Sequence, residues 1–478
     1  MPRIFDNILQ LLTVLWGIIR IILPKRLQSS QMLDKSMVKT LSSKLKASWL
    51  QWPVERSGHG FRVFVVEPRE YRPEMHALLF NAALKNLTEP PLRDALDNSS
   101  YTSETAQFLL NDPKDGRDRF DLITFPEAFL PKDDLLERLK CIRTPGCIHV
   151  GLRPSIDPAR ILFRTVEVRQ LIDDIKENVL NIVEDDLKSI TEWINDDRNR
   201  DQNFNIACLF TVDFKGKVRV CLHPKIVSAG IESTPLHDTN MHDADLYSLV
   251  TLLPTDNSFL SITIQPLICA DALFIDADKL SCQPLQAISS ADHFDNSPPD
   301  HIDIVSVTTC TEQKKHATVG RKWHQGFRDS FTHTIKLLKR HHSTVFILSN
   351  YNNISKSVLG GLSGVFLPIP LSKGVYPEEV TFSVYGRAEE DKDADNDWHY
   401  MSAKDLSEDG SKLSSLGYIT AIAPQENGVE AAHMLGFTIY QLPRHSASWP
   451  SPKKNGLKAF TLRVANNNLG TVVFEKRY

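Results

Sequence analysis

Cysteine is scarce in this chain. Only seven cysteines occur among 478 residues, and none of them forms a Cys-x-x-Cys pair or stands at a metal-ligand spacing. This scarcity excludes a secreted disulfide scaffold and favours a reducing, cytoplasmic compartment. The histidine clusters lie in polar sequence away from cysteines, which is typical of solvated loops rather than metal sites. We therefore expect no metal and no cofactor.

An excess of charge of one sign is also missing. The chain has 55 Lys and Arg against 59 Asp and Glu, which gives a formal net charge of −4, and it contains no sustained basic stripe. Proteins that bind nucleic acid usually carry a basic face. We therefore expect no nucleic-acid partner.

An uninterrupted apolar run of membrane-spanning length is absent from the N-terminus. Residues 4–23 are mostly apolar, but Asp6, Gln10, Thr13 and Arg20 interrupt them, whereas a span needs about 20 apolar residues. Together with Gly17, these residues follow one another at steps of four, three, four and three, so they share one narrow stripe of a helix. The pattern predicts a helix that packs on a partner subunit, on the body of the protein or on a membrane surface.

Strand-like and helix-like segments alternate from about residue 60 onward. "FRVFVVEP" reads as a strand, "PEMHALLFNAALKNL" as a helix, "DLITF" as a strand, "DDLLERLK" as a helix and "GCIHVGLRP" as a strand. This alternation indicates an α/β fold. We expect an α/β domain over residues 60–440, preceded by a helical or irregular extension over residues 1–59. A short helix is expected at residues 43–53 of that extension.

Two further segments depart from simple alternation. Apolar residues recur at steps of three and four across residues 165–203, which predicts one long inserted amphipathic helix or a broken pair of helices. The sequence "NFNIACLFTVDFKGKVRVCLHPKI" then has two strand-like runs around a Lys-Gly turn, as in a β-hairpin. Residues 441–478 are expected to end the chain in another β-hairpin.

Three chemically capable side chains follow predicted core strands. Glu127 comes after "LITF", Lys225 after "VRVCLHP" and Cys269 after "SITIQPLI". Strand ends are where α/β sheets carry reactive groups, because helices cover the faces of the sheet. Each residue also has a simpler reading: an exposed loop glutamate, a solvated lysine and an inert core thiol.

Taken together, the three residues resemble the nitrilase superfamily of carbon–nitrogen hydrolases. The likeness rests on Phe-Pro-Glu after a strand, a lysine after a hairpin, and "ICAD" as the family's Cys-x-Asp. It continues in "RKWHQGFRDSFTHTIKLLKRHHSTVFILSNYNN" and "LGGLSGVFLPIP", and it spans about residues 60–440. The resemblance implies a four-layer α-β-β-α sandwich, here with an N-terminal helical extension and a long inserted helix.

The resemblance also implies a mechanism. Cys269 would attack the carbon of a small amide or a nitrile and form a thioester, with Glu127 as general base. Lys225 would favour the thiolate and stabilise the oxyanion, together with the backbone N–H of Ala270. Asp271 would brace the turn after the nucleophile. Members of the family are usually dimers or larger homo-oligomers, and most are amidases.

Some features leave alternatives open. Glu232 stands where many members have a second glutamate, but it reads equally well as a loop residue. The segment between Glu127 and Lys225 is longer than usual for the family, and no Pro-Glu follows "ICADALF". The alternative function is therefore a nitrilase-like scaffold or interaction module in a larger assembly, such as a bacterial defence or signalling complex, with weak or no hydrolysis.

Overall fold

The computed structural model describes about half of the chain. It covers residues 46–54, 61–68, 76–84 (without 78 and 82), 120–142, 146–157, 160–228, 240–255, 261–273, 301–310, 344–351 and 363–366, with isolated positions at 299, 327, 330, 331, 334 and 339–341. For residues 367–370, 380–386, 418–422, 430–439, 459–465 and 471–473 it describes the strand backbone. The structural statements below concern these residues.

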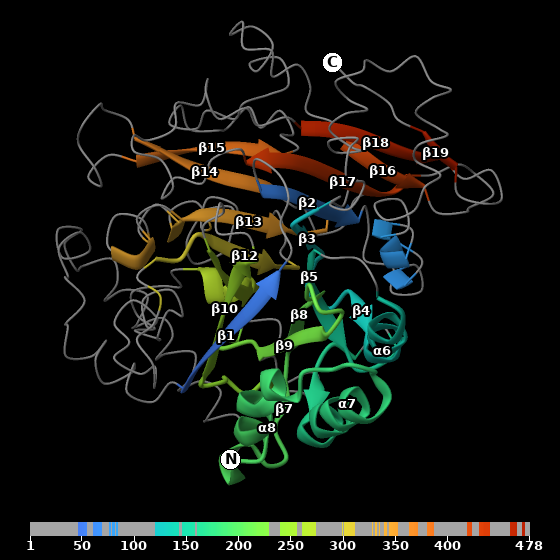
Figure 1. Ribbon diagram of the computed structural model, residues 1–478, viewed down its shortest axis with the longest axis vertical. Helices are drawn as coiled ribbons and strands as arrows, with labels where there is room; N and C mark the ends of the chain where they lie inside the picture. The colour runs from blue at the N-terminus through green and yellow to red at the C-terminus, as the bar shows by residue number, and fades with distance from the viewer. Residues whose placement is uncertain are drawn as a thin grey trace, which may run out of the picture.

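The fold is mixed α/β, with two large sheets, one small sheet and few helices (Figure 1). In spatial order, the seven-stranded sheet contains β1 (Lys46–Val54), β10 (Leu246–Pro254), β11 (Ile262–Ile268), β12 (Ile304–Thr308), β13 (Val345–Ser349), β14 (Gly364–Pro370) and β15 (Val380–Gly386). The path of the ten-stranded sheet runs through β19 (Thr471–Val473), β18 (Ala459–Ala465), β16 (Tyr418–Ile422), β17 (Glu430–Ile439), β2 (Phe61–Pro68), β3 (Leu122–Thr124), β5 (Cys147–Arg153), β8 (Ile206–Val212) and β9 (Val218–Pro224), and β4 (Leu130–Pro131) pairs with β5 off this path. The small sheet pairs β6 (Phe163–Arg164) with β7 (Asn203–Phe204).

The two large sheets pack face to face. Strands β12 and β13 contact β3, and β10 and β11 contact β9, across the interface. Alternate residues of both sheets point into one apolar core, including Val63 and Val65 of β2 and Ile262 and Ile264 of β11. Period-two alternation in the sequence is what allows each strand to present one apolar face to this core.

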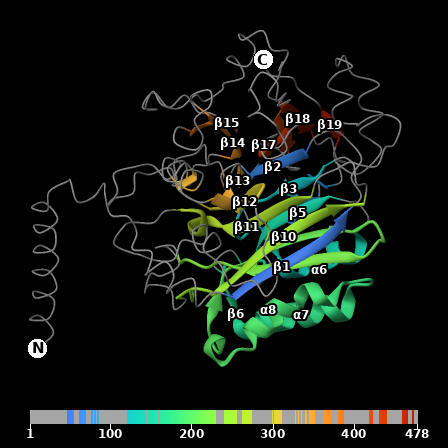
Figure 2. The ribbon, with the colours of Figure 1, turned by 60° about the vertical axis from the view of Figure 1, so that its left-hand side comes forward.

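Helices cover the outer face of the ten-stranded sheet. Helix α6 (Lys132–Cys141), helix α7 (Thr165–Asn178) and helix α8 (Lys188–Ile194) bury their apolar stripes against the outer residues of the sheet, such as Phe210 and Leu222. Figure 2 shows α7 and α8 side by side along one end of the sheets. On the other sheet, Phe331, at a helical position, stacks on Phe346 of β13 with ring centroids 4.0 Å apart.

Of the two arrangements expected for the inserted segment, the broken pair of helices is the one observed, and the long inserted helix is wrong. Helix α7 ends at Asn178, and Asn181 then adopts a left-handed backbone with φ of 61°. The Asn181 carbonyl accepts from the backbone N–H of Val218, and Ile182 bridges to the same residue of β9. Because residues 181–183 pair with a strand edge, the chain cannot continue the helix before η2 (Glu184–Leu187) and α8.

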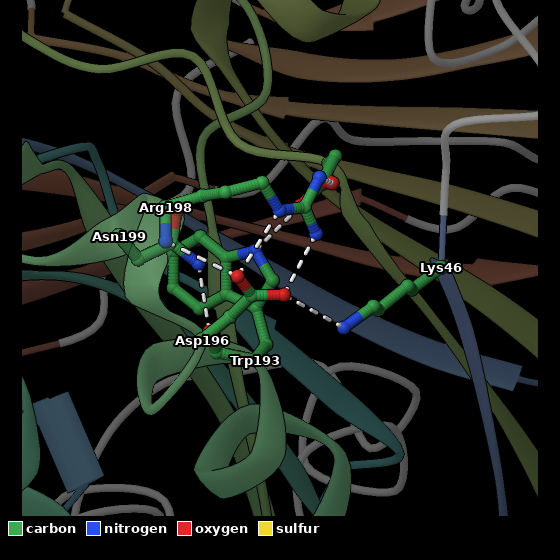
Figure 3. Close-up of polar contacts among 6 residues, drawn as sticks. Lys46, Trp193, Asp196, Arg198 and Asn199 are labelled. Carbon is green, nitrogen blue, oxygen red and sulfur yellow. Dashed lines mark hydrogen bonds and ion pairs between the residues drawn. The ribbon is translucent and has the colours of Figure 1, made fainter.

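A polar cluster anchors the inserted segment to the sheets (Figure 3). The indole N–H of the buried Trp193 donates to Asp245 Oδ1 at 2.8 Å, and Arg198 Nη1 donates to Asp245 Oδ2 at 3.1 Å. Asp196 accepts from Arg198 Nη2 at 2.8 Å and lies 3.5 Å from the ammonium of Lys46, at the start of β1. Asp245, directly before β10, is thus the acceptor that joins the insertion to the seven-stranded sheet.

Asp245→Ala is expected to loosen the inserted segment. The substitution removes the acceptor of a buried indole N–H, which costs about 1 to 3 kcal/mol. Amide hydrogen exchange of α8 should therefore speed up more than exchange of β8 or β9. Lys46→Ala is the matched control, because Lys46 is half-exposed and surface pairs contribute little. Equal exchange of α8 in both variants would contradict this anchoring role.

Residues 46–54 form strand β1, so the short helix expected at residues 43–53 is wrong. β1 pairs in parallel with β10 from Lys46 to Val54 and buries Trp52 completely. The indole N–H of Trp49 donates to Thr251 Oγ1 at 2.8 Å. The segment reads as a helix in isolation because the partner strand lies about 200 residues further along the chain. It is part of the seven-stranded sheet rather than of an irregular extension.

Other strands match their expectations. β8 and β9 pair antiparallel as a hairpin whose turn is closed by the Gly216 N–H and the Asp213 carbonyl. β18 and β19 also pair antiparallel, and β18 lies against β16 and β17, so this C-terminal hairpin joins the ten-stranded sheet. Residues 4–23 and Glu232 lie outside the described residues. Within the described part of the chain, no helix has the length and apolar character to cross a membrane.

Candidate functional site

The predicted trio of residues comes from both large sheets. Glu127 follows β3 and Lys225 follows β9, and both strands belong to the ten-stranded sheet. Cys269 directly follows β11 of the seven-stranded sheet. All three side chains are buried, with exposed fractions of 5 % for Glu127, 1 % for Lys225 and 4 % for Cys269. Glu127 is therefore not an exposed loop glutamate, and Lys225 is not a solvated lysine.

The Glu127 carboxylate accepts three charge-assisted hydrogen bonds. Lys225 Nζ donates to Oε1 at 2.8 Å, and Asn205 Nδ2 donates to the same oxygen at 2.7 Å. The backbone N–H of Cys310 donates to Oε2 at 3.0 Å. A buried carboxylate is stable only when its charge is paired and hydrogen-bonded, and these donors meet that need.

The backbone around Glu127 explains why its side chain points inward. Ala128, directly after it, has a left-handed φ of 50°. Gly151 of β5 lies so close that a Cβ there would stand 2.4 Å from the Glu127 Cα, so only glycine fits. The Tyr351 hydroxyl donates to the Glu127 carbonyl at 2.9 Å. The turn is therefore held by β5 and by Tyr351, two residues beyond β13, and the carboxylate is fixed against Lys225.

Asn205 is a site residue that the sequence analysis missed. Its side chain donates to Glu127, and its carbonyl accepts from the backbone N–H of Lys225 at 2.8 Å. One residue therefore sets the positions of both members of the ion pair. An isolated asparagine before a strand has no recognisable pattern, so no signal in the sequence identifies it.

Cys269 begins a tight turn with a strained backbone. Its φ is 45°, and it opens the 3₁₀ turn η4 (Cys269–Ala272), of which Ala270 is the second residue. Left-handed backbone at a residue with a side chain costs about 1 to 3 kcal/mol and is common at functional sites. Cys269 packs against Ala207 and Ile268, and Ala207 lies two residues after Asn205. Cys269 thus lies on the side of β11 that faces the ten-stranded sheet.

Asp271 connects the cysteine turn to the lysine turn. Its Oδ1 accepts from the backbone N–H groups of Ile226 and Val227 at 3.0 and 2.8 Å, and its Oδ2 accepts from Ile268 at 3.3 Å. These contacts are the bracing geometry expected for Asp271. Burial raises the pKa of Asp271 to about 8, opposed by the Lys225 charge and by the three N–H donors.

A chain of buried polar groups lies between the sheets close to these strand ends. His149 Nε2 and His223 Nε2 are 3.1 Å apart, His149 Nδ1 lies 2.8 Å from Ser306 Oγ, and Ser306 Oγ lies 3.0 Å from Thr124 Oγ1. His223 precedes Lys225 by two residues, and Thr124 precedes Glu127 by three. Burial lowers the pKa of His223 to about 3 and holds the pKa of His149 well below its usual value, so both rings are neutral.

Among the described residues, no group of three or more His, Cys, Asp or Glu side chains is arranged so that it could bind a metal ion. The remaining buried thiols are unsuited to reaction, because burial raises the pKa of Cys147 and Cys221 to about 12 and that of Cys208 well above its usual value.

Comparison of the chain with protein-family models and with curated protein sequences finds no match. The proposed function therefore depends on the geometry of the described residues.

Proposed function

We propose that this protein hydrolyses a non-peptide carbon–nitrogen bond in a small amide or a nitrile. The observation that carries the proposal is the buried pair of Lys225 and Glu127, 2.8 Å apart, joined through Asp271 to the strained turn of Cys269. Ion pairs are costly to bury, so one whose lysine turn is tied to the turn of a strained cysteine favours a site over packing.

The proposed reaction passes through a covalent intermediate. For an amide, Cys269 Sγ attacks the carbonyl carbon, and its proton moves to the Glu127 carboxylate. The Lys225 ammonium and the Ala270 N–H stabilise the developing oxyanion, and Glu127 returns the proton to the leaving nitrogen. Glu127 then takes a proton from water as the water attacks the thioester, which releases the acid and restores the thiol.

We also propose that the fold is a four-layer sandwich of the nitrilase type, and three observations support this architecture. Two sheets pack face to face, α6, α7 and α8 cover one outer face, and Phe331 packs from a helical position on the other. Asn205 and the Cys310 N–H hold Glu127 in one orientation, which a general base needs. We propose in addition that the protein forms a homo-oligomer and that residues 4–23 bind a protein or a membrane surface.

An interaction module is the second candidate function. The inserted segment exposes two large apolar side chains, Leu180 at 82 % and Val166 at 63 %. Apolar side chains so exposed on an added element are compatible with a partner protein, and such a role could accompany activity or replace it. Reactivity at Cys269 distinguishes the two functions.

The decisive test is alkylation of Cys269 by iodoacetamide as a function of pH, followed by peptide mass analysis. Selective labelling near neutral pH is expected, since Lys225 favours the thiolate, and labelling should weaken in Lys225→Ala and Glu127→Gln. Cys147, Cys208 and Cys221 provide inert internal references. If Cys269 reacts no faster than the exposed Cys141 and neither substitution changes its rate, the hydrolase is excluded and the interaction module is favoured.

A further inference from the structure

A second thiol lies beside the candidate site. Cys310 follows β12, and its side chain is partly exposed and packs against the edge of the outer apolar core. Its backbone N–H holds Glu127 Oε2 at 3.0 Å. The proposed mechanism uses this N–H but gives the Cys310 thiol no task.

The register of β11 and β12 brings Cys310 near Cys269. These neighbouring strands are parallel, with Ile268 opposite Thr308 in the last pair. Cys269 is one residue beyond that pair and Cys310 two residues beyond it. Neighbouring strands lie about 4.8 Å apart, so the ends of β11 and β12 stand side by side and each carries a cysteine within two residues of the last pair. Disulfides join Cα atoms about 4.4 to 6.8 Å apart, a span of the same order as this strand spacing.

Both cysteines also lie in or against segments that hold Glu127. The Thr309 carbonyl accepts from the Glu127 backbone N–H at 3.4 Å, so residues 309 and 310 run alongside the glutamate turn. On the other side, Cys269 packs on Ala207, in the stretch that begins with Asn205, the donor to Glu127 Oε1. The Cys310 backbone thus contacts Glu127, and Cys269, at the adjacent strand end, packs two residues from Asn205, another donor to Glu127.

We propose that Cys310 is a resolving thiol for Cys269, so that a peroxide converts the site reversibly into a Cys269–Cys310 disulfide. The inference rests on the proposed function, because it needs Cys269 to react as a thiolate. The Cys269 thiolate attacks a peroxide oxygen: an S–O bond forms, the O–O bond breaks, and the peroxide is reduced while Cys269 becomes a sulfenic acid. Cys310 then attacks the Cys269 sulfur: the S–S bond forms, the S–O bond breaks, and the Cys310 proton leaves with the hydroxide as water.

The disulfide would protect the nucleophile from further oxidation. A sulfenic acid without a nearby thiol proceeds to sulfinic and sulfonic acids, which thiol reductants do not reverse. A disulfide that includes the partly exposed Cys310 is accessible to a reductant. The site would thus be switched off by peroxide and restored by a thiol.

The test uses the full-length protein with hydrogen peroxide as the probe. After graded peroxide, free thiols are blocked with N-ethylmaleimide, and peptides are analysed without reduction. We expect a linked Cys269–Cys310 peptide that dithiothreitol removes, with full recovery of Cys269 alkylation by iodoacetamide. In Cys310→Ser, which keeps the backbone N–H to Glu127, recovery should be lost and Cys269 should appear as sulfinic or sulfonic acid. Cys141→Ser is the matched control and should behave as wild type.

The outcomes separate this inference from the proposed function. If Cys269 alkylates selectively but peroxide gives sulfinic acid while Cys310 remains free, the resolving role is excluded and the hydrolase proposal stands. If the linked peptide forms while Cys269 shows only ordinary alkylation, the proximity of the two thiols is supported and the hydrolase proposal fails. Equal recovery in wild type and Cys310→Ser would also overturn the resolving role.

Discussion

Glu127→Gln is expected to lower the free energy of unfolding by about 3 to 5 kcal/mol, the usual cost of removing one charge from a buried ion pair. The substitution keeps the size of the side chain, but the Lys225 ammonium, 1 % exposed, then faces an uncharged amide at a distance of 2.8 Å. Turnover of any amide substrate should fall by at least the roughly 100- to 10,000-fold that a general base contributes. Urea unfolding measures the first effect and ammonia release the second.

The double variant makes this prediction specific. Lys225→Met alone should also be strongly destabilising, whereas Glu127→Gln with Lys225→Met removes both charges and should lose less stability than the sum of the single variants by about 2 kcal/mol or more. Lys132→Met is the matched control, because it breaks an exposed pair with Asp133 and should change stability by less than about 1 kcal/mol. Additive effects of the two buried substitutions would show that Glu127 and Lys225 do not act as a pair.

Acid is expected to destabilise the protein through the buried pair His149 and His223. The folded-state pKa of His223, about 3, lies below the ordinary value of 6.5, so the unfolded chain binds more protons between these pH values. The contribution of His223 to stability is therefore complete above pH 6.5 and is lost as pH falls toward 3. One pKa unit corresponds to about 1.4 kcal/mol, so His223 alone accounts for about 3 kcal/mol between pH 6.5 and pH 4.

His223→Gln isolates this effect. The free energy of unfolding, measured from pH 7 to pH 4, should fall less steeply in the variant than in the wild type, even if the variant is less stable at pH 7. Asp186 and Asp271 act in the opposite direction, since their pKa values are raised to about 7 and about 8, but they are common to both proteins and cancel in the comparison. Parallel pH profiles would mean that the imidazole pair is not kept neutral by burial.

Local patterns predicted much of the fold. Alternation of apolar residues identifies β2, and the Lys-Gly turn identifies the hairpin of β8 and β9, because both signals depend on neighbouring residues. The strand β1 was misread as a helix because its pairing with β10 is a contact between distant parts of the chain. The spacing of apolar residues across residues 165–203 fits one helix or two. The break between α7 and α8 depends instead on the pairing of residues 181–183 with β9, which is a contact between distant residues.

The candidate site divides in the same way. Glu127, Lys225 and Cys269 were found because each is a chemically capable side chain directly after a predicted strand. Asn205 and the Cys310 N–H were not found, because their role comes from where the chain places an amide donor rather than from the residue type. A backbone N–H has no signature in a sequence.

The sequence by itself determined the alternation of strands and helices, the residues at the strand ends and the chemistry that those side chains permit, since all three are properties of short segments. The tertiary structure alone decided that Glu127 and Lys225 come from one sheet and Cys269 from the facing sheet, and that Asp271 ties their turns together. It also decided the burial of the ion pair and the neutrality of His149 and His223. These properties depend on which distant segments exclude water from one another, and that is set by the packing of the two sheets rather than by any local pattern.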